Sequence, residues 1–232
     1  AVFSRYVDRM LGDMKFTNAL AYIDDILVFA KTEEEHLSTL SQLFSRLSEF
    51  NMTLGAKKCA IAADSVAFLG HVVDREGVKP DTSKIKAIRA LDIDEIQTSQ
   101  KMESALGLMP YYRKFVKNYN DVERPLRATC NAGPSAWHKK DGKVQYSDAE
   151  RKSFAKLRDA LQGDPVLAHP DWGQPFELHC DASKVGLGAV LTQRIDGKEH
   201  VVSYASRSLT SAESNYSIWE LECLAIVWAT RL

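Results

Sequence analysis

Two adjacent carboxylates, Asp24 and Asp25, lie between apolar runs at residues 19–23 and 26–30. Two apolar runs separated by only two residues predict a tight β-hairpin, with the acidic pair in its turn. Neighbouring carboxylates repel each other, and pairs such as Asn-Gly suit such turns better, so this pair indicates a bound cation. Mg²⁺ binds one or two carboxylates together with substrate phosphates, which makes a nucleotide-handling site one interpretation. A solvated acidic turn is the alternative, because Asp is common in turns.

A third candidate carboxylate, Asp181, closes an apolar strand predicted at residues 176–180. A carboxylate that is buried without a partner is costly, so this residue needs a cation or hydrogen-bond donors. A turn or capping aspartate is the alternative. On a helix predicted further along the chain, Glu220 and Glu222 could each supply another carboxylate. Residues two apart on a helix point in different directions, so only one of them is expected to face the strand.

The segments around these residues carry helical and extended patterns. Helices are predicted at residues 1–12, 32–51, 81–91, 99–109 and 147–161, and strands at 66–73, 176–180, 187–193 and 201–205. A last helix is predicted to begin at Thr210, with Glu213 as its capping partner, and to run to Leu232. Three prolines and a glycine between residues 164 and 175 indicate a domain boundary.

The composition is 45% hydrophobic and 26% charged with a net charge of -1, which excludes a disordered or fibrous chain. Residues 73–163 carry a net charge of +5, between flanks of -2 and -4, so the middle could neutralise phosphates. The four cysteines lie far apart and have no metal-binding spacing, which favours incidental thiols in a reducing compartment. No membrane span and no signal peptide are visible, so an intracellular protein without a membrane partner is expected.

The sequence Tyr22-Ile23-Asp24-Asp25, followed by Ile26-Leu27-Val28-Phe29, resembles the metal-binding hairpin of the reverse transcriptase palm. Other motifs follow in the order found in Pol polyproteins of gypsy-type (Metaviridae) long-terminal-repeat retrotransposons. Among them are Phe68-Leu69-Gly70-His71, Tyr111-Tyr112-Arg113-Lys114-Phe115 and Pro125-Leu126. The ribonuclease H of the same elements is similar to Asp181-Ala182-Ser183, Tyr204-Ala205-Ser206-Arg207 and Glu222-Cys223-Leu224-Ala225. The resemblance covers essentially the whole chain.

This resemblance implies an α/β (α+β) fold in four parts. They are the C-terminal part of a reverse transcriptase palm (residues 1–78), a helical thumb (79–129), a connection (130–163) and the N-terminal part of a ribonuclease H-like domain (164–232). The implied activities are RNA-directed DNA polymerase and RNA–DNA hybrid endonuclease, both by two-metal phosphoryl transfer with Mg²⁺, or with Mn²⁺ in its place.

The resemblance also implies the partners. They are an RNA or DNA template-primer, RNA–DNA hybrids, deoxynucleoside triphosphates and the remaining Pol segments, namely fingers and palm upstream and ribonuclease H and integrase downstream. The expected location is a cytoplasmic virus-like particle.

The resemblance assigns roles residue by residue. Asp24 and Asp25 match polymerase metal ligands, and Asp181 and Glu222 match nuclease metal ligands, where the spacing to Ala225 favours Glu222. Lys58, with Lys57 as the alternative, matches the lysine that protonates the departing pyrophosphate, although a surface lysine would look the same. Nucleic-acid contacts are expected beside the primer end, in the primer-gripping hairpin and in the thumb, at Tyr22, Phe68, Leu69, Gly70, His71, Tyr111, Tyr112, Arg113 and Lys114. Core packing is the alternative for the hairpin and thumb residues.

The family completes both metal sites with carboxylates from outside residues 1–232. We therefore expect that the parent protein copies nucleic acid and degrades hybrids, whereas this fragment alone is inactive. A non-enzymatic nucleic-acid-binding protein, or a degenerate or domesticated retroelement remnant, is the alternative function.

Overall fold

The computed structural model describes residues 2–131, 139–140, 143–163 and 165–232. The chain forms two compact units, Ala1–Ala63 and Asp64–Leu232, and each is considered by itself. Parts of the expected connection, residues 132–138 and 141–142, lie outside the described residues, as does residue 164 at the expected start of the last domain. The described elements combine helices with antiparallel sheets, which confirms the α+β class.

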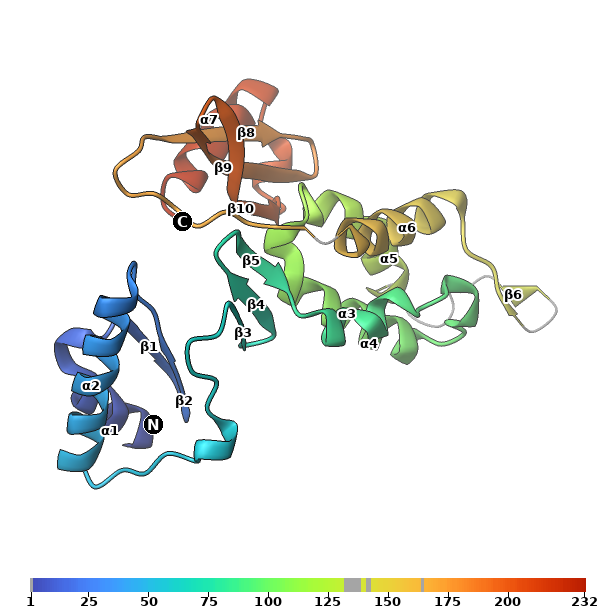
Figure 1. Cartoon of the computed structure of the whole chain (residues 1–232). Helices are drawn as coiled ribbons and strands as arrows, with labels where there is room; N and C mark the ends of the chain where they lie inside the picture. Colours follow the sequence, from blue (N-terminus) through green and yellow to red (C-terminus); the bar gives the residue numbers. More distant parts are fainter. Residues whose placement is uncertain (1, 132–138, 141–142, 164) are drawn as a thin grey trace. The chain divides into compact units, whose positions relative to one another are not determined.

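In the first unit, helices α1 (Val2–Leu11) and α2 (Glu33–Glu49) pack beside a hairpin of β1 (Ala19–Tyr22) and β2 (Asp25–Val28), as Figure 1 shows. Helix α2 begins where the sequence predicts, because the Thr32 side chain accepts a hydrogen bond from the Glu35 amide at 3.2 Å. The core of this unit consists of Val7, Met10, Leu11, Met14, Ala19, Leu43 and Leu47.

The hairpin turn lies one residue earlier than the sequence predicts. Tyr22 pairs with Asp25, so Ile23 and Asp24 form the turn and Asp25 begins the second strand. The predicted register differs from the observed one by two residues, and both place the same side chains on the core-facing side. Hydrophobic alternation therefore could not distinguish the two registers.

The second unit begins with an antiparallel sheet of β3 (Ser65–Phe68), β4 (His71–Asp74) and β5 (Gly77–Pro80). The sequence predicts one strand over residues 66–73, which is wrong. Leu69 at φ +49° and Gly70 at φ +67° form a tight turn that splits it. A leucine at positive φ is unusual, and no sequence pattern announces it.

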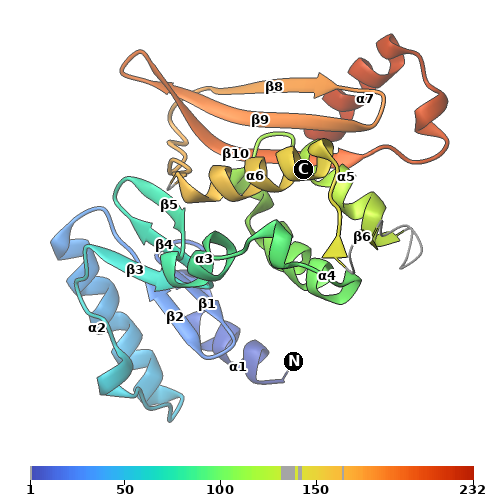
Figure 2. The same cartoon turned by 90° about the vertical axis from the view of Figure 1, so that its right-hand side faces the viewer.

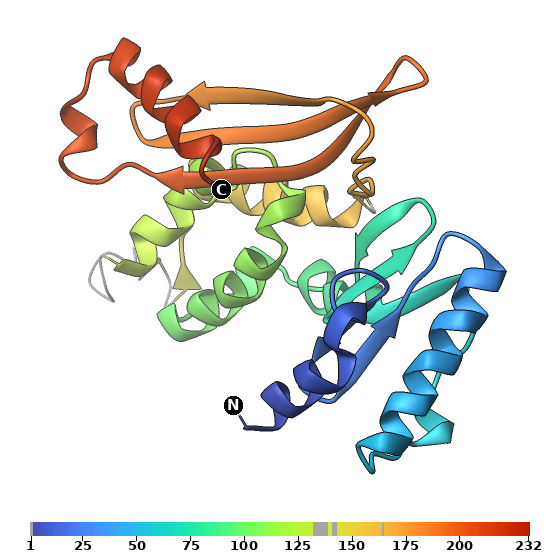
Figure 3. The ribbon, with the colours of Figure 1, turned by 90° about the vertical axis from the view of Figure 1, so that its left-hand side faces the viewer.

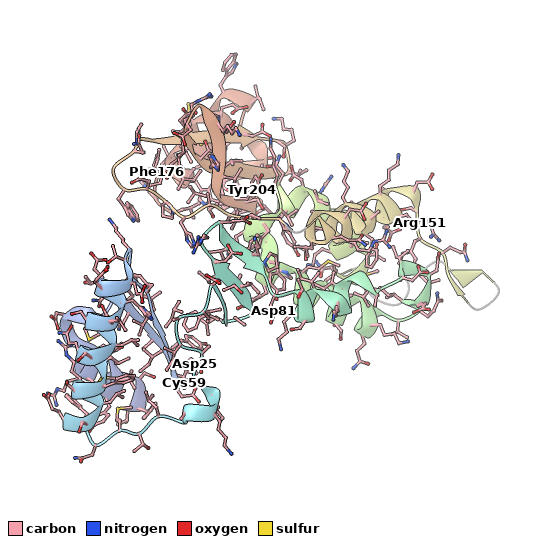
Figure 4. All side chains as sticks on the ribbon, viewed as in Figure 1. Asp25, Cys59, Asp81, Arg151, Phe176 and Tyr204 are labelled. Atoms are coloured by element: carbon pink, nitrogen blue, oxygen red, sulfur yellow. The ribbon has the colours of Figure 1, made fainter. Side chains whose placement is uncertain are left out.

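Helices α3 (Thr82–Arg89), α4 (Ser99–Leu108), α5 (Tyr119–Asn131) and α6 (Asp148–Gln162) surround the core of the second unit. The 3-10 segment η4 (Met109–Phe115) replaces the break expected at Pro110, and α5 has no counterpart among the predicted helices. The core contains Ile85, Ile88, Met102, Leu106, Met109, Leu126, Phe154, Leu157 and Leu161, and Tyr204 packs against it (Figure 4). No helix in the described part of the chain could span a membrane.

The last part of the chain is a three-stranded antiparallel sheet in the order β10-β9-β8. Its strands are β8 (Phe176–Ala182), β9 (Gly186–Ile195) and β10 (Lys198–Ser208), all longer than the apolar runs in the sequence. Helix α7 (Ile218–Ala229) lies across one face, where Leu221 and Ala225 pack on Ala182 and Leu187 (Figure 3). Helix α5 lies beside the sheet near β10 (Figure 2).

Helix α7 begins later and ends earlier than the sequence predicts. Thr210 and Glu213 do form the expected capping pair, but it opens only a short 3-10 segment. A second capping box, made by Ser217 and Glu220, starts the helix itself. The helix then ends at Ala229 rather than at the last residue. Two capping pairs follow each other closely, and the sequence alone does not show which of them starts the long helix.

An ion pair holds β10 to the segment before α7. The Arg207 guanidinium binds Glu213 through two hydrogen bonds of 2.7 and 2.9 Å. This pairing, together with the Thr210 amide, lowers the pKa of Glu213 from 4.5 to about 2. Because the folded-state pKa lies below the unfolded one, Glu213 stabilises the fold above about pH 4.5, and this contribution is lost as the pH falls towards 2.

We therefore expect Glu213→Gln to lower the free energy of unfolding at neutral pH and to flatten its decline between pH 4.5 and 2. Urea unfolding at a series of pH values measures both effects. The exposed Glu95 is the control, and Glu95→Gln should reproduce the wild-type curve. Identical pH curves for the two variants would contradict the assignment.

Candidate active sites

The tip of the β1–β2 hairpin presents Asp24 and Asp25 to solvent. Figure 4 labels Asp25. Asp25 pairs across the strands with Tyr22, and Asp24 lies in the turn beside it. Ile23 in the same turn has a φ of +56°, a left-handed conformation that costs a β-branched residue on the order of 1–3 kcal/mol. Tyr22 and Ile23 are 54% and 55% exposed, so burial of these side chains does not offset the strain. Strain at an exposed acidic tip is a pointer to function.

The charges at this tip favour a cation. Within the described residues, no ion pair or side-chain hydrogen bond involves Asp24 or Asp25, so their mutual repulsion is not neutralised by the protein. Carboxylate oxygens are the hard ligands that Mg²⁺ prefers. No group of three or more His, Cys, Asp or Glu side chains converges into a metal site within the described ranges. The tip thus offers two carboxylates and fits a divalent cation whose remaining ligands are substrate phosphates and water.

The expected catalytic lysine lies in the 3-10 segment η2 (Ala56–Lys58) of the first unit. The Lys58 amide donates to the Gly55 carbonyl at 2.8 Å, which fixes its backbone, and its side chain is exposed. Lys57 is exposed as well. Within the described residues, no hydrogen bond or ion pair joins either lysine to the hairpin tip, so the catalytic role of Lys58 stays a prediction.

Two tyrosines of η4 hold the turn between β3 and β4. The Tyr112 hydroxyl donates to the Gly70 carbonyl at 3.0 Å, and the Tyr111 hydroxyl donates to the Leu69 carbonyl. The Asp81 amide also donates to Gly70, at 3.0 Å. Helix α3 starts at this point, with Asp81 as its cap (Figure 4). Both turn carbonyls are therefore satisfied from within the second unit.

The four residues of η4 that are predicted to contact nucleic acid differ in how far their side chains are exposed. Tyr112 is only 3% exposed and presents no ring face to a ligand, so the packing alternative describes it. Tyr111 is 52% exposed and can still offer its ring. Arg113 is exposed, whereas Lys114 is half-buried and burial lowers its pKa. Of the four nucleic-acid contacts predicted here, Tyr111 and Arg113 are therefore the two with exposed side chains, and their contact role stays a prediction.

His71 braces the same turn from inside an aromatic cluster. Its ring centroid lies 5.2 Å from that of Tyr111 and 5.7 Å from that of Phe115. Its Nδ1 lies 2.7 Å from the Leu69 carbonyl, so a neutral imidazole donates there. Burial and the nearby charge of Lys114 lower its pKa. These contacts describe a supporting residue. Gripping roles for His71, Phe68, Leu69 and Gly70 stay predictions.

Asp181 lies on β8 and pairs with Gly188 of β9. The neighbouring Cys180 and Ala182 pack with α7. Side chains alternate along a strand, so Asp181 points to the opposite face of the sheet. There the Asn118 side-chain amide donates to the Asp181 carboxylate at 3.4 Å. The exposed carboxylate thus has one of the donors that the sequence argument calls for.

Glu222 lies half-buried on α7, close to the edge strand β8. Burial raises the pKa of the Cys180 thiol, and the charge of Glu222 raises it further. Glu220 is engaged elsewhere, because its carboxylate accepts a hydrogen bond from the Ser217 amide at 2.7 Å. This favours Glu222 over Glu220 as a ligand. Asp181 therefore lies on one face of β8, and Glu222 lies on the helix that covers the other face.

The N-terminal and C-terminal regions of the chain each match a known protein family. Residues 1–73 match the family model for reverse transcriptase (RNA-dependent DNA polymerase), and residues 146–231 match the RNase H-like domain found in reverse transcriptase. The retrovirus-related Pol polyproteins from transposons 297 and gypsy of Drosophila melanogaster are 37% and 34% identical to the chain over 232 and 233 residues. The chain belongs to the gypsy-type retroelement Pol family.

This Pol segment spans about a fifth of those relatives, because alignments that cover 100% and 99% of it cover 21% and 22% of the transposon 297 and gypsy polyproteins. Among solved structures, the foamy viral protease-reverse transcriptase in complex with RNA/DNA hybrid matches with a TM-score of 0.78 at 22% identity. That match covers 100% of the segment and 30% of the viral chain. The likeness confirms the reverse transcriptase fold expected from the sequence.

Sequence reasoning missed the Pol segment's contact between Asn118 and Asp181, which lie 63 positions apart. Asn118 has a φ of +50°, a conformation that Asn tolerates better than most residues. The one signal available in the sequence was the pair Gly186 and Gly188 on β9, since glycines within a strand often mark a close approach by other atoms.

Proposed function

We propose that this Pol segment contributes metal-binding carboxylates to two phosphoryl-transfer sites of a reverse transcriptase. Asp24 and Asp25 serve the RNA-directed DNA polymerase site, and Asp181 and Glu222 serve the site that cleaves the RNA strand of hybrids. The observation that carries this proposal is the exposed carboxylate pair on a strained hairpin tip, inside a segment that matches the reverse transcriptase family.

At the polymerase site, Asp24 and Asp25 hold Mg²⁺, or Mn²⁺ in its place, against the phosphates of a deoxynucleoside triphosphate. A cation held by these two carboxylates would neutralise phosphate charge and favour deprotonation of the attacking hydroxyl. The fixed hairpin keeps both carboxylates in place, so little reorganisation is needed during transfer. Tyr22 shares a strand face with Asp25 and lies beside the primer end, and Lys58 donates a proton to the departing pyrophosphate.

At the nuclease site, Asp181 and Glu222 would hold the same kind of cation. Among the described residues, no backbone amide donates to either carboxylate, and the cap of α7 is completed by Glu220. The substrate is an RNA–DNA hybrid, whose RNA strand is cut by water. Template-primer contacts come from the Leu69–Gly70 turn and from the exposed Tyr111 and Arg113, within a middle segment of net charge +5.

The partners of this segment follow from its place in Pol. They are template-primer, hybrid, deoxynucleoside triphosphates and the remaining parts of the polyprotein, including upstream fingers and palm and downstream ribonuclease H and integrase. We place the protein inside the cell, in a cytoplasmic virus-like particle, because the family resemblance favours that location.

The test is primer extension and hybrid cleavage by the Pol protein that contains this segment, with the isolated segment assayed beside it. The Pol protein should show both activities with Mg²⁺ and lose both with a chelator. The sequence-based expectation that the segment alone is inactive is tested in the same assay. Nucleic-acid binding without either activity in the Pol protein would favour the non-enzymatic, degenerate or domesticated remnant.

A further inference from the structure

The face of the sheet that carries Asp181 is met by a polar segment at the start of α5. The Asn118 amide nitrogen donates to Asp181 at 3.4 Å, and its carbonyl oxygen lies over Gly188. A Cβ atom on Gly188 would lie 2.2 Å from that oxygen, which is far closer than atoms can approach. Gly188 pairs directly with Asp181, so the absence of a side chain on β9 makes the space that Asn118 occupies.

Neighbouring contacts fix the position of this segment on the sheet. The Ser183 hydroxyl donates to the Asp121 carboxylate at 3.2 Å, and a Cβ on Gly186 would lie 2.7 Å from the same carboxylate. The Asn120 amide donates to the Ser206 hydroxyl at 3.1 Å. Gly186 and Gly188 lie on one strand face. Gly186 faces Asp121 in the first turn of α5, and Gly188 faces Asn118, the residue immediately before that helix. The segment is therefore docked across all three strands.

The backbone of Asn118 also has an unusual conformation. Its φ of +50° is left-handed, and its carbonyl accepts the first hydrogen bonds of α5, from the amides of Asp121 and Val122 at 3.0 and 3.2 Å. Helix and turn together aim the side chain at Asp181. A donor held by rigid elements can orient one oxygen of a carboxylate and leave the other available to a metal.

We propose that Asn118 is a positioning residue for the hybrid-cleaving site: it orients the Asp181 carboxylate and links that site to α5. The inference rests on the proposed role of Asp181 as a metal ligand. It adds a residue from outside the ribonuclease H-like domain, in the segment that the sequence assigns to the thumb. A change in the position of α5 would therefore be transmitted to the carboxylate.

The variant Asn118→Gly tests this, because glycine keeps the left-handed backbone and removes only the amide. Asn120→Ala is the matched control: it removes the side chain that bonds Ser208 at 3.3 Å in the same interface, without touching Asp181. Both are made in the Pol protein. The measurements are Mn²⁺ binding by electron paramagnetic resonance, the Mg²⁺ concentration for half-maximal hybrid cleavage, and primer extension.

We expect Asn118→Gly to weaken, by about tenfold, the Mn²⁺ site that Asp181→Asn abolishes, and to raise the half-maximal Mg²⁺ concentration for cleavage by a similar factor. Primer extension should not change, and Asn120→Ala should leave all three measurements at wild-type values. Gly188→Ala, which displaces Asn118 without altering it, should reproduce the Asn118→Gly result.

Equal effects of Asn118→Gly and Asn120→Ala would overturn the proposal, because they would show that the interface only packs. Wild-type metal binding and cleavage in Asn118→Gly would overturn it as well, while leaving the proposed function standing. If the wild-type Pol protein shows neither hybrid cleavage nor a Mn²⁺ site sensitive to Asp181→Asn, the proposed nuclease function itself fails and takes this inference with it.

Discussion

Asp25→Asn in the Pol protein should lower primer extension by at least about a thousandfold, because a metal ligand in phosphoryl transfer is worth several kcal/mol of barrier. Asparagine keeps the size of the side chain, but it removes the charge and replaces one acceptor oxygen by a donor group. Asp25 is exposed at the start of β2 and lies away from the core, so the hairpin should keep its register. Loss of activity should therefore not be accompanied by loss of folding.

The reciprocal change, Asp181→Asn, separates the two sites. Asp25→Asn should leave hybrid cleavage within about twofold of wild type, whereas Asp181→Asn should abolish cleavage and spare extension. Glu49→Gln, an exposed carboxylate at the end of α2, is the control and should change neither activity. Parallel loss of both activities in either variant, or full extension by Asp25→Asn, would remove the case for two separate carboxylate sites.

The second large effect concerns stability. Gly77 begins β5 with a φ of +150°, and a Cβ added there would lie 2.1 Å from the Leu167 carbonyl oxygen. That carbonyl accepts a hydrogen bond from the Val78 amide at 2.8 Å, and the Leu167 amide donates to Val78 at 2.9 Å. The obstructing atom is backbone and the φ value excludes most side chains, so the clash cannot be relieved by a rotamer change.

We therefore expect Gly77→Ala to destabilise the second unit by more than about 3 kcal/mol, from backbone strain together with two disrupted hydrogen bonds. Urea unfolding followed by circular dichroism measures it. Gly107→Ala is the control, because an added Cβ there meets nothing within 4 Å and Gly107 lies in α4. That change should stabilise the chain by up to about 1 kcal/mol. Equal stability of Gly77→Ala and wild type would show that the pairing of β5 with Leu167 is not needed.

The pairing also has a functional consequence. The strand β5 belongs to the sheet whose Leu69–Gly70 turn is proposed to grip the primer, and Leu167 lies in the segment that leads to β8. If this pairing breaks, the backbone hydrogen bonds that hold the β3-β4-β5 sheet to the segment before β8 are lost. Gly77→Ala should therefore lower the temperature at which hybrid cleavage is lost, even where the purified protein is folded at 25 °C.

Several features of this protein are determined by short stretches of sequence. The capping box of Ser147 and Glu150 starts α6 where it is predicted, and the Thr32 side chain caps α2 by accepting a hydrogen bond from the Glu35 amide. Each signal consists of a side chain and an amide three residues away, so nothing distant is needed to form it. The acidic pair Asp24-Asp25 is equally local. These signals determine where α2 and α6 begin and locate the hairpin turn to within one residue.

Tertiary structure decided the features for which local signals were equal or absent. The sequence leaves the β1–β2 register open because both registers bury the same side chains. It leaves the start of α7 open because two capping pairs compete. The turn at Leu69 needs a positive φ that hydroxyls from η4 help to hold. Asn118 reaches Asp181 only because α5 docks on β9 at a glycine. In each case the deciding contacts join residues far apart in sequence, and sequence periodicity carries no information about them.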